Sequence, residues 1–339
     1  MVSVYSAAHF LVDFACAFMM FRFISTSPEW YLCLLIYNFC AFAMQMPIGI
    51  LADKLSRNHL FAGIGCVLVG AAYGLTGIPM AATIVVGLGN GMFHIGGGLD
   101  VLNISEEKSS ALGVFVSPGA FGIYFGTMLG RGSGLTALPV LLALLAAAAL
   151  IILMRRVRPG AYVGNAPFSP EVSPRLMATV VCLFLVVCVR SYAGLAVSFP
   201  WKSAGLWGLA LVCASAFGKT AGGFLSDRFG PLETAIFSLA VSALLFLFPQ
   251  LPGAGVPAVF LFNMTMPITL WVVARIFPGA KGFSFGLLTF ALFLGFVPVH
   301  LGVVAPLWLF APAAVVSLVL MLVGLHRLKD KSRTRKEDR

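Results

Sequence analysis

The sequence predicts an all-α integral membrane protein with twelve transmembrane helices, arranged as two six-helix bundles. Of its 339 residues, 60% are hydrophobic and only 10% are charged, which argues against a water-soluble globule. The charges are bunched and are separated by apolar runs far longer than a soluble core needs. The net charge of +10 lies mostly in short loops and a basic tail. That pattern is typical of the cytoplasmic face of a membrane protein and not of nucleic-acid binding.

The twelve spans follow from the charge-poor runs, because about 20 apolar residues cross the hydrocarbon core. Single spans are expected at residues 3–21, 31–52, 109–130, 135–154, 176–199 and 203–225, with Asp13, Arg190 and Lys219 as their charged members. Three longer runs without Asp, Glu, Lys or Arg hold two spans each: 58–99 divides at 76–79, 234–274 at 249–253, and 282–326 near 302–306. Gly and Pro at these division points favour turns. No room is left for a soluble domain.

The basic residues predict the orientation. With the N-terminus inside, only Arg22, Arg131 and Lys202 fall on the outer side. Both chain ends are therefore expected in the cytoplasm, in a multi-pass protein of the cell (cytoplasmic) membrane. The first span lacks a basic flank before it, so it is not expected to be a cleaved signal peptide. The expected organisation is an N-terminal bundle (1–154), a cytoplasmic linker (155–174), a C-terminal bundle (175–326) and a basic tail (327–339).

All seven cysteines lie in expected spans and form no CxxC pair. They are interpreted as small apolar packing residues, with no disulfide and no metal. The sequence contains no phosphate-binding loop, nucleophile motif or metal-ligand spacing, so neither an enzyme nor an ATP-driven pump is expected. No cofactor is expected either.

An internal repeat supports the two-bundle plan. The segment from Gly49 to Arg57 closes the second span, and a similar segment from Gly223 to Gly230 closes the eighth. Duplicated membrane bundles usually place the substrate site at their interface, near the membrane midplane.

These two segments resemble the G-x-L-a-D-x-x-G-R loop signature of the major facilitator superfamily of secondary transporters, with Ser56 where a glycine is usual. Residues 113–122 are similar to the antiporter pattern of that superfamily. His9 and Asp13, Phe93-His94 and Arg190-Ser191 resemble the fosmidomycin-resistance branch, with Ile95 where a proline is usual. The resemblance implies a 6+6 helical plan, export of antibiotics by proton exchange, and function as a monomer.

Asp13 and His9 are the candidate proton-coupling residues. A carboxyl group within a membrane span is costly as a charge, which favours taking up and releasing a proton. His9 lies one helical turn away on the same face and adds a second titratable group. The alternative interpretation is that both residues only hydrogen-bond neighbouring helices.

Arg190 is the candidate anion or switch residue, because an arginine within a span normally has a partner or an anionic ligand. The repeat places it near Asp13, so protonation of Asp13 would free Arg190 for the substrate; a permanent ion pair between the bundles is the alternative. Lys219 is expected to extend toward the cytoplasmic interface. The other candidate substrate contacts are Asn90, His94, Asn263, Thr265 and Thr269. These polar groups could also simply join helices.

The loop signature predicts a gate at the cytoplasmic end. Asp53 and Arg57 follow the second span, and Asp100 arrives at the same end of the fourth, so a carboxylate and arginine network is expected to tie these ends together. The full set of candidate gating residues is Gly49, Asp53, Arg57, Asp100, Gly223, Asp227 and Arg228.

The expected function is proton-coupled export of a small anionic or amphipathic compound by alternating access. Proton-coupled uptake of a small organic anion remains open, because direction is not encoded in these residues. A transport-inactive membrane receptor or scaffold is the reading from another class. The buried Asp13 and Arg190 argue against it, since a scaffold does not need them. The expected partners are protons, a small-molecule substrate and the lipid bilayer, without nucleic acid.

Overall fold

The structure, a computed structural model, describes residues 1–105, 108–132, 134–157, 159–167, 173–196 and 198–337. Within these ranges it is all helices and turns, with no β-strand. Eleven of the helical segments are long and apolar enough to cross a membrane. The all-α, multi-pass class predicted from composition is therefore confirmed.

The N-terminal half contains interrupted spans. A π turn (Met20–Ile24) extends the first helix, and a second π turn (Phe39–Ala43) joins the two helices of the second span. The fifth span is also divided, because Pro118 begins a new helix and offers no backbone N–H to the preceding turn. The helices are α1 (Val2–Met19), α2 (Trp30–Asn38), α3 (Gln45–Leu55), α4 (Asn58–Ala72), α5 (Pro79–Ile104), α6 (Ser110–Val116), α7 (Pro118–Arg131) and α8 (Ala137–Val157).

The C-terminal half repeats this plan, with its tenth span broken at Met264. Its helices are α9 (Pro174–Ala196), α10 (Trp207–Phe229), α11 (Pro231–Leu245), α12 (Pro252–Asn263), α13 (Thr265–Ile276), α14 (Lys281–His300) and α15 (Phe310–Glu337). Short 3₁₀ turns lie at Tyr73–Leu75, Pro159–Ala161 and Leu307–Leu309.

The ninth expected span, α11, is shorter than the sequence indicates. It has 15 residues, or about 22 Å at 1.5 Å per residue, against a hydrocarbon core of about 30 Å. Gly230 at φ 99° and Pro231 fix its start, and turns begin directly after Leu245. The expectation of twelve full-length spans thus becomes eleven long helices and one short apolar helix in the described ranges.

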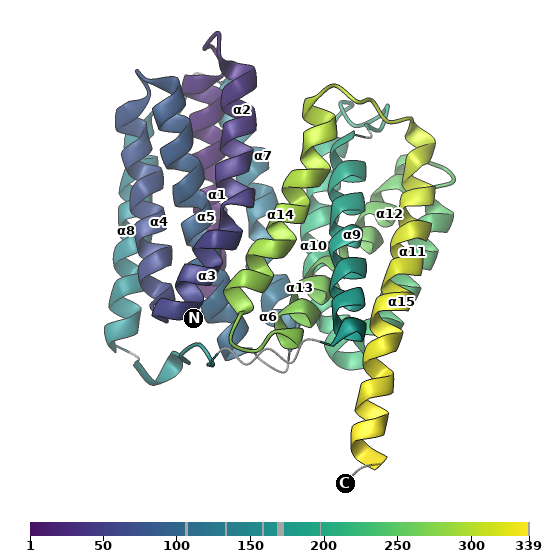
Figure 1. The fold of residues 1–339 in the computed structure, drawn as a ribbon. Coiled ribbons are helices and arrows are strands. Elements are labelled where there is room, and N and C mark those ends of the chain that lie inside the picture. The colour runs from purple at the N-terminus through teal and green to yellow at the C-terminus, as the bar shows by residue number, and fades with distance from the viewer. Residues whose placement is uncertain (106–107, 133, 158, 168–172, 197, 338–339) are drawn as a thin grey trace.

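The two halves stand side by side, α1 to α8 on one side and α9 to α15 on the other (Figure 1). The N- and C-termini lie toward the same end of the bundle. We call this end, which carries the turns after α3 and α10, the inner end, following the predicted orientation. The halves meet along two seams, between α3 and α14 and between α6 and α10.

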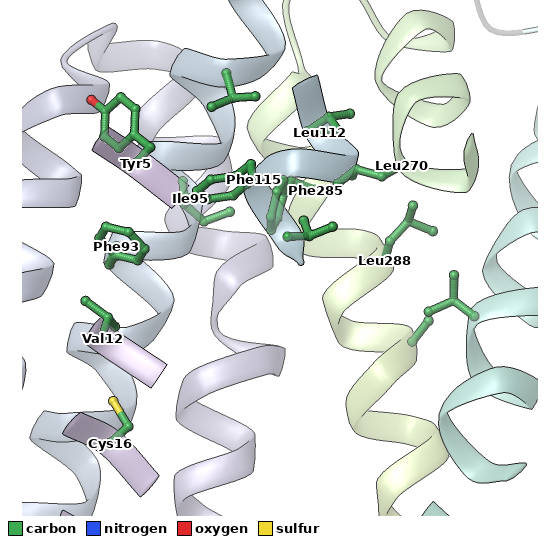
Figure 2. Packing of buried hydrophobic residues seen from close by; sticks show 14 of the residues in the cluster. Tyr5, Val12, Cys16, Phe93, Ile95, Leu112, Phe115, Leu270, Phe285 and Leu288 are labelled. Atoms are coloured by element: carbon green, nitrogen blue, oxygen red, sulfur yellow. The ribbon is translucent and has the colours of Figure 1, made fainter. Parts of the chain in front are cut away.

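The core continues across the interface at the inner end. Figure 2 shows Phe285 of α14 beside Phe115 and Leu112 of α6. Phe285 also reaches α5, where a Cβ on Gly98 would overlap its ring. An apolar side chain of one half is therefore inserted against a glycine of the other at the inner end.

Candidate functional site

One face of α1 carries polar side chains at helical spacing. Tyr5, His9 and Asp13 follow each other at four-residue intervals, so they lie on one face of the helix. All three are buried, and this face packs against α5, α6 and α7. Because the chain places them between helices and away from lipid, they must find polar partners inside the bundle.

His9, Asp13 and His94 form a buried cluster, here called the triad. His9 Nε2 lies 3.2 Å from Asp13 Oδ2 and 2.8 Å from His94 Nε2, and His94 Nε2 lies 3.6 Å from Asp13 Oδ1. The side chains come from α1 and α5, two helices that the sequence separates widely. The amide of Asn90, one turn before His94, donates to Asp13 Oδ1 at 3.0 Å.

Backbone carbonyls fix the orientation of both imidazoles. His9 Nδ1 donates to Phe115 O at 2.7 Å, and His94 Nδ1 donates to Asn90 O at 2.9 Å. A carbonyl oxygen only accepts, so both Nδ1 atoms carry hydrogen and both Nε2 atoms of the neutral rings present lone pairs. Two imidazole lone pairs and a carboxylate therefore converge on one point. Such an arrangement requires a positive charge, supplied by a proton on one ring or by another small cation.

Helix α7 closes the triad from the side through glycines. A Cβ on Gly119 would overlap Asp13 Oδ2 and lie 2.6 Å from His9 Nε2. Further along the helix, any side chain at the next glycines would strike the backbone of α1. We call this surface the glycine face of α7; it comprises Gly119, Gly122, Gly126 and Gly130. The sequence analysis noted only the similarity of residues 113–122 to an antiporter pattern and did not predict glycines packed beside a polar cluster.

Arg190 lies across the interface, in α9, and is not paired with Asp13. It donates to Thr265 Oγ1 at 3.3 Å, at the break between α12 and α13. The ion pairs of Asp13 are with His9 and His94, and within the described ranges neither Arg190 nor Lys219 forms an ion pair with it. The predicted Asp13–Arg190 ion pair is therefore wrong for this conformation, because the two histidines already surround Asp13.

Lys219 of α10 is half-buried and interacts electrostatically with both Arg190 and Asp13. The extension of its ammonium toward the cytoplasmic interface stays a prediction. The C-terminal half thus contributes two cationic side chains within its spans, Arg190 in α9 and Lys219 in α10. This pair is suited to a negatively charged ligand.

The polar residues of the tenth span bond to carbonyls of their own span, and Asn263 also accepts from Ser215 of α10 at 3.3 Å. Asn263 donates to Val259 O at 2.8 Å, and Thr269 donates to Met266 O at 2.9 Å. Thr265 both accepts from Arg190 and bonds to its own helix. Only Thr265 of these three thus reaches a charged candidate residue.

The inner end carries two reciprocal caps. Asp53, at the end of α3, accepts from the backbone N–H groups of Gly282 and Phe283 at 2.8 and 2.9 Å, at the start of α14. Asp227, at the end of α10, accepts from the N–H groups of Ser109 and Ser110 at 2.6 and 3.1 Å, at the start of α6. Each half therefore caps a helix N-terminus of the other half with a carboxylate.

The glycines of the loop signature make these caps sterically accessible. A Cβ on Gly49 would overlap the backbone of Gly282, and a Cβ on Gly223 would lie 2.7 Å from the Cα of Ser110. Both signature glycines thus let the carboxylate-bearing helix approach the helix it caps. This contact between halves is a finding that the sequence repeat alone does not provide.

The predicted network of Asp53, Arg57 and Asp100 does not form. Asp100 instead accepts from the hydroxyl of Tyr5 at 2.5 Å, and Asp53 is occupied by α14. Arg57 is exposed just before α4, and Arg228 lies over the ring of Phe229 at 5.2 Å. The carboxylates are satisfied by backbone N–H groups and a phenol, so the arginines stay outside.

The linker also reaches the inner end, which sequence reasoning missed. The backbone N–H of Asn165 donates to Ser56 Oγ at 2.9 Å, and its side chain joins Asn58 and Asn103. Asn103 in turn accepts from Lys281 of α14 at 3.1 Å. Ser56 has a left-handed conformation, φ 51°, at the position where the loop signature usually has glycine. These residues tie the linker to the gate.

Comparison with known proteins places the fold. No family model and no curated protein matches the chain. Among solved structures, FucP in its outward conformation is similar at a TM-score of 0.64 and 15% identity, over 96% of this chain and 98% of FucP. A variant of that E. coli fucose:proton symporter gives 0.65 and 13% over the same shares. The human organic anion transporter MFSD10 (TETRAN) gives 0.69 and 16%, over 95% and 98%.

The chain has the major facilitator superfamily fold. The near-complete coverage of both chains supports the predicted helical fold at this coarse level. The similarity concerns the fold, and the fosmidomycin-resistance branch, the orientation in the membrane and the boundaries of the two bundles stay predictions.

Proposed function

We propose that this protein is a proton-coupled secondary transporter that exports a small anionic or amphipathic compound by alternating access. The observation that carries the proposal is the convergence of three lone-pair groups in the triad. His9 and His94 cannot donate to Asp13 through Nε2 unless one of them holds an additional proton, because both Nδ1 protons are held by carbonyls. The triad is thus suited to bind and release a proton between α1 and α5 of the N-terminal half.

The second element is the pair of cations opposite the triad. Arg190 and Lys219 have no carboxylate partner within the described ranges, and Lys219 interacts with Asp13 across the interface. When the triad is deprotonated, Asp13 attracts these cations. When it is protonated, the attraction weakens and the cations are available to an anion. Proton binding and anion binding are therefore coupled through Lys219.

The third element is the inner gate. The caps at Asp53 and Asp227 stabilise the state in which the inner end is closed, and both must break for the inner end to open. The seams between α3 and α14 and between α6 and α10 would then separate as the halves rotate. A structural element with two discrete arrangements is what alternating access requires.

The likeness of residues 113–122 to an antiporter pattern favours exchange, and with it export, over joint uptake. Uptake of a small organic anion together with a proton is the second candidate. The electrostatics favour it, because protonation of the triad weakens the attraction of Asp13 for Arg190 and Lys219. The proton and the anion would then bind to the same state of the protein. FucP, a fucose:proton symporter, and MFSD10, an organic anion transporter, share the fold, which supports proton coupling and an anionic substrate as candidates.

The deciding experiment measures proton movement in proteoliposomes with a pH-sensitive dye inside. Small carboxylates and phosphonates are added outside to wild type, to Asp13→Asn, and to Glu29→Gln as an exposed acidic control. We expect a compound that drives proton flux in wild type and in the Glu29 variant, and none in Asp13→Asn. Flux that persists in Asp13→Asn would refute the assignment of the proton site. The sign of the flux separates exchange from joint uptake.

A further inference from the structure

The triad also has the geometry of a transition-metal site. Its three potential ligand atoms are separated by 2.8, 3.2 and 3.6 Å. Zn²⁺ binds imidazole nitrogen and carboxylate oxygen at about 2.0–2.2 Å, so two ligands of a tetrahedral ion lie about 3.3 Å apart. The ligand atoms of His9, Asp13 and His94 come together within 4.8 Å. Small changes of these separations would place all three at bonding distance from one ion.

The surroundings of the triad match those of metal-binding histidines. A ligating imidazole almost always donates its other N–H to a carbonyl or carboxylate, which fixes the tautomer. Both His9 and His94 donate through Nδ1 to backbone carbonyls and turn Nε2 inward. The carboxylate is oriented as well, since Asn90 donates to Asp13 Oδ1 at 3.0 Å. The outer hydrogen bonds that a metal site needs are thus in place.

The triad has free space beside Gly119, and two of its side chains are slightly exposed. Gly119 leaves free the space that a Cβ would occupy beside Asp13 and His9. Asp13 and His94 each retain 8% exposure, so the triad is not sealed. Two histidines and one carboxylate form a donor set that suits Zn²⁺, Fe²⁺ and related ions better than Mg²⁺ or Ca²⁺, which prefer oxygen.

We propose that His9 Nε2, His94 Nε2 and a carboxylate oxygen of Asp13 bind one divalent transition-metal ion of the Zn²⁺ type, with the remaining position open to water or an anion. The binding rests on the geometry of the triad. Competition between the ion and the coupling proton rests in addition on the proposed function. An ion held here places positive charge opposite Lys219 and Arg190 and blocks proton uptake, so it inhibits transport.

The test is equilibrium dialysis of chelator-stripped, detergent-purified protein against Zn²⁺, with metal measured by mass spectrometry. Wild type and His59→Gln, a matched histidine variant outside the triad, are expected to bind one ion. Asp13→Asn and His94→Gln are expected to bind at least about tenfold more weakly, since loss of even an outer hydrogen-bond partner costs 10- to 100-fold. Equal binding by all four proteins would overturn the proposal.

A gain-of-signal variant guards against misfolding. Asp13→Cys exchanges the carboxylate for a thiolate, so Co²⁺ bound at the triad acquires a sulfur-to-metal absorption band that the wild type lacks. Absence of this band in a protein that elutes as the wild type does would count against the site.

Proton flux measured with and without a chelator separates the two proposals. Flux in chelator that Asp13→Asn abolishes, together with no Zn²⁺ binding by wild type, defeats the metal site alone. Zn²⁺ binding without any flux defeats the proposed function alone.

Discussion

The caps at the inner end give the sharpest prediction about the gate. In Asp53→Asn, the amide keeps one oxygen for the N–H of Gly282 or Phe283 but turns an N–H₂ group toward the other, and the negative charge at the start of α14 is lost. Removing an N-cap costs about 0.5–2 kcal/mol, and the charge at a helix terminus adds about 0.3–1 kcal/mol. We therefore expect the closed inner end to lose about 1–2 kcal/mol.

A loss of this size changes the population ratio of closed to open inner end by about 5- to 30-fold. The assay is pulsed electron resonance between spin labels at Leu55 and Phe229, two exposed positions at the ends of α3 and α10 in opposite halves. Asp53→Asn is expected to increase the population with a long label separation. Lys54→Gln, an exposed neighbour, serves as the control and should leave the distribution unchanged.

The double variant Asp53→Asn with Asp227→Asn tests whether both caps belong to one transition. If both break in the same opening step, their costs add on one equilibrium, about 2–4 kcal/mol or roughly 30- to 900-fold. Distance distributions that neither single nor double variant alters would refute the caps as the gate. Substrate binding should survive in the single variants, because both carboxylates lie away from the triad.

Three further predictions concern strain, packing and the anion site. Both Ser56→Ala and Ser56→Gly lose the hydroxyl that accepts from Asn165, but only glycine relieves the strain of the left-handed backbone. The alanine variant should therefore melt at the lower temperature, and the reverse order in thermal unfolding would contradict this account. Gly98→Ala should open the inner end in the spin-label assay because its Cβ overlaps Phe285, and Phe285→Leu should restore closure; an unchanged distribution means that the ring finds other space. Arg190→Gln should weaken anion binding by about 10- to 150-fold, the equivalent of a charged hydrogen bond of about 1.5–3 kcal/mol, as measured by calorimetry; unchanged affinity removes Arg190 from the substrate site.

The sequence predicted those parts of the fold that depend on local composition. Charge-free runs located the spans because burying a charge in hydrocarbon is costly wherever it occurs. The tenth span divides at Met264, where Gly222 of α10 packs against its backbone, and local composition does not indicate this contact. The shortness of α11 and the two π turns depend on such packing and have no clear sequence pattern.

The sequence predicted which residues of the candidate site share a helix face, but it did not predict which helices bring those residues into contact. Spacing correctly placed His9 with Asp13, and Asn90 with His94, on common faces. That these two faces meet depends on how α1 packs on α5, which one sequence does not specify. The repeat offset suggested Arg190 as the partner of Asp13. The offset aligns backbone positions of the two halves, but it does not show that His9 and His94 lie nearer to the carboxylate. Tyr5 lay on the same face as His9 and could have been included on spacing alone.

The two helices of the divided fifth span contact different parts of the molecule. Helix α7 packs along its glycine face against α1, with Gly119 beside the triad. Helix α6 is hydrogen-bonded through the backbone N–H of Ser110 to Asp227 of the other half. The break between them is at Ser117, whose hydroxyl forms a hydrogen bond with that of Thr220 at 2.7 Å. The fifth span is therefore a continuous stretch of chain that connects the triad of one half, through the break at Ser117, to the Asp227 cap of the other half.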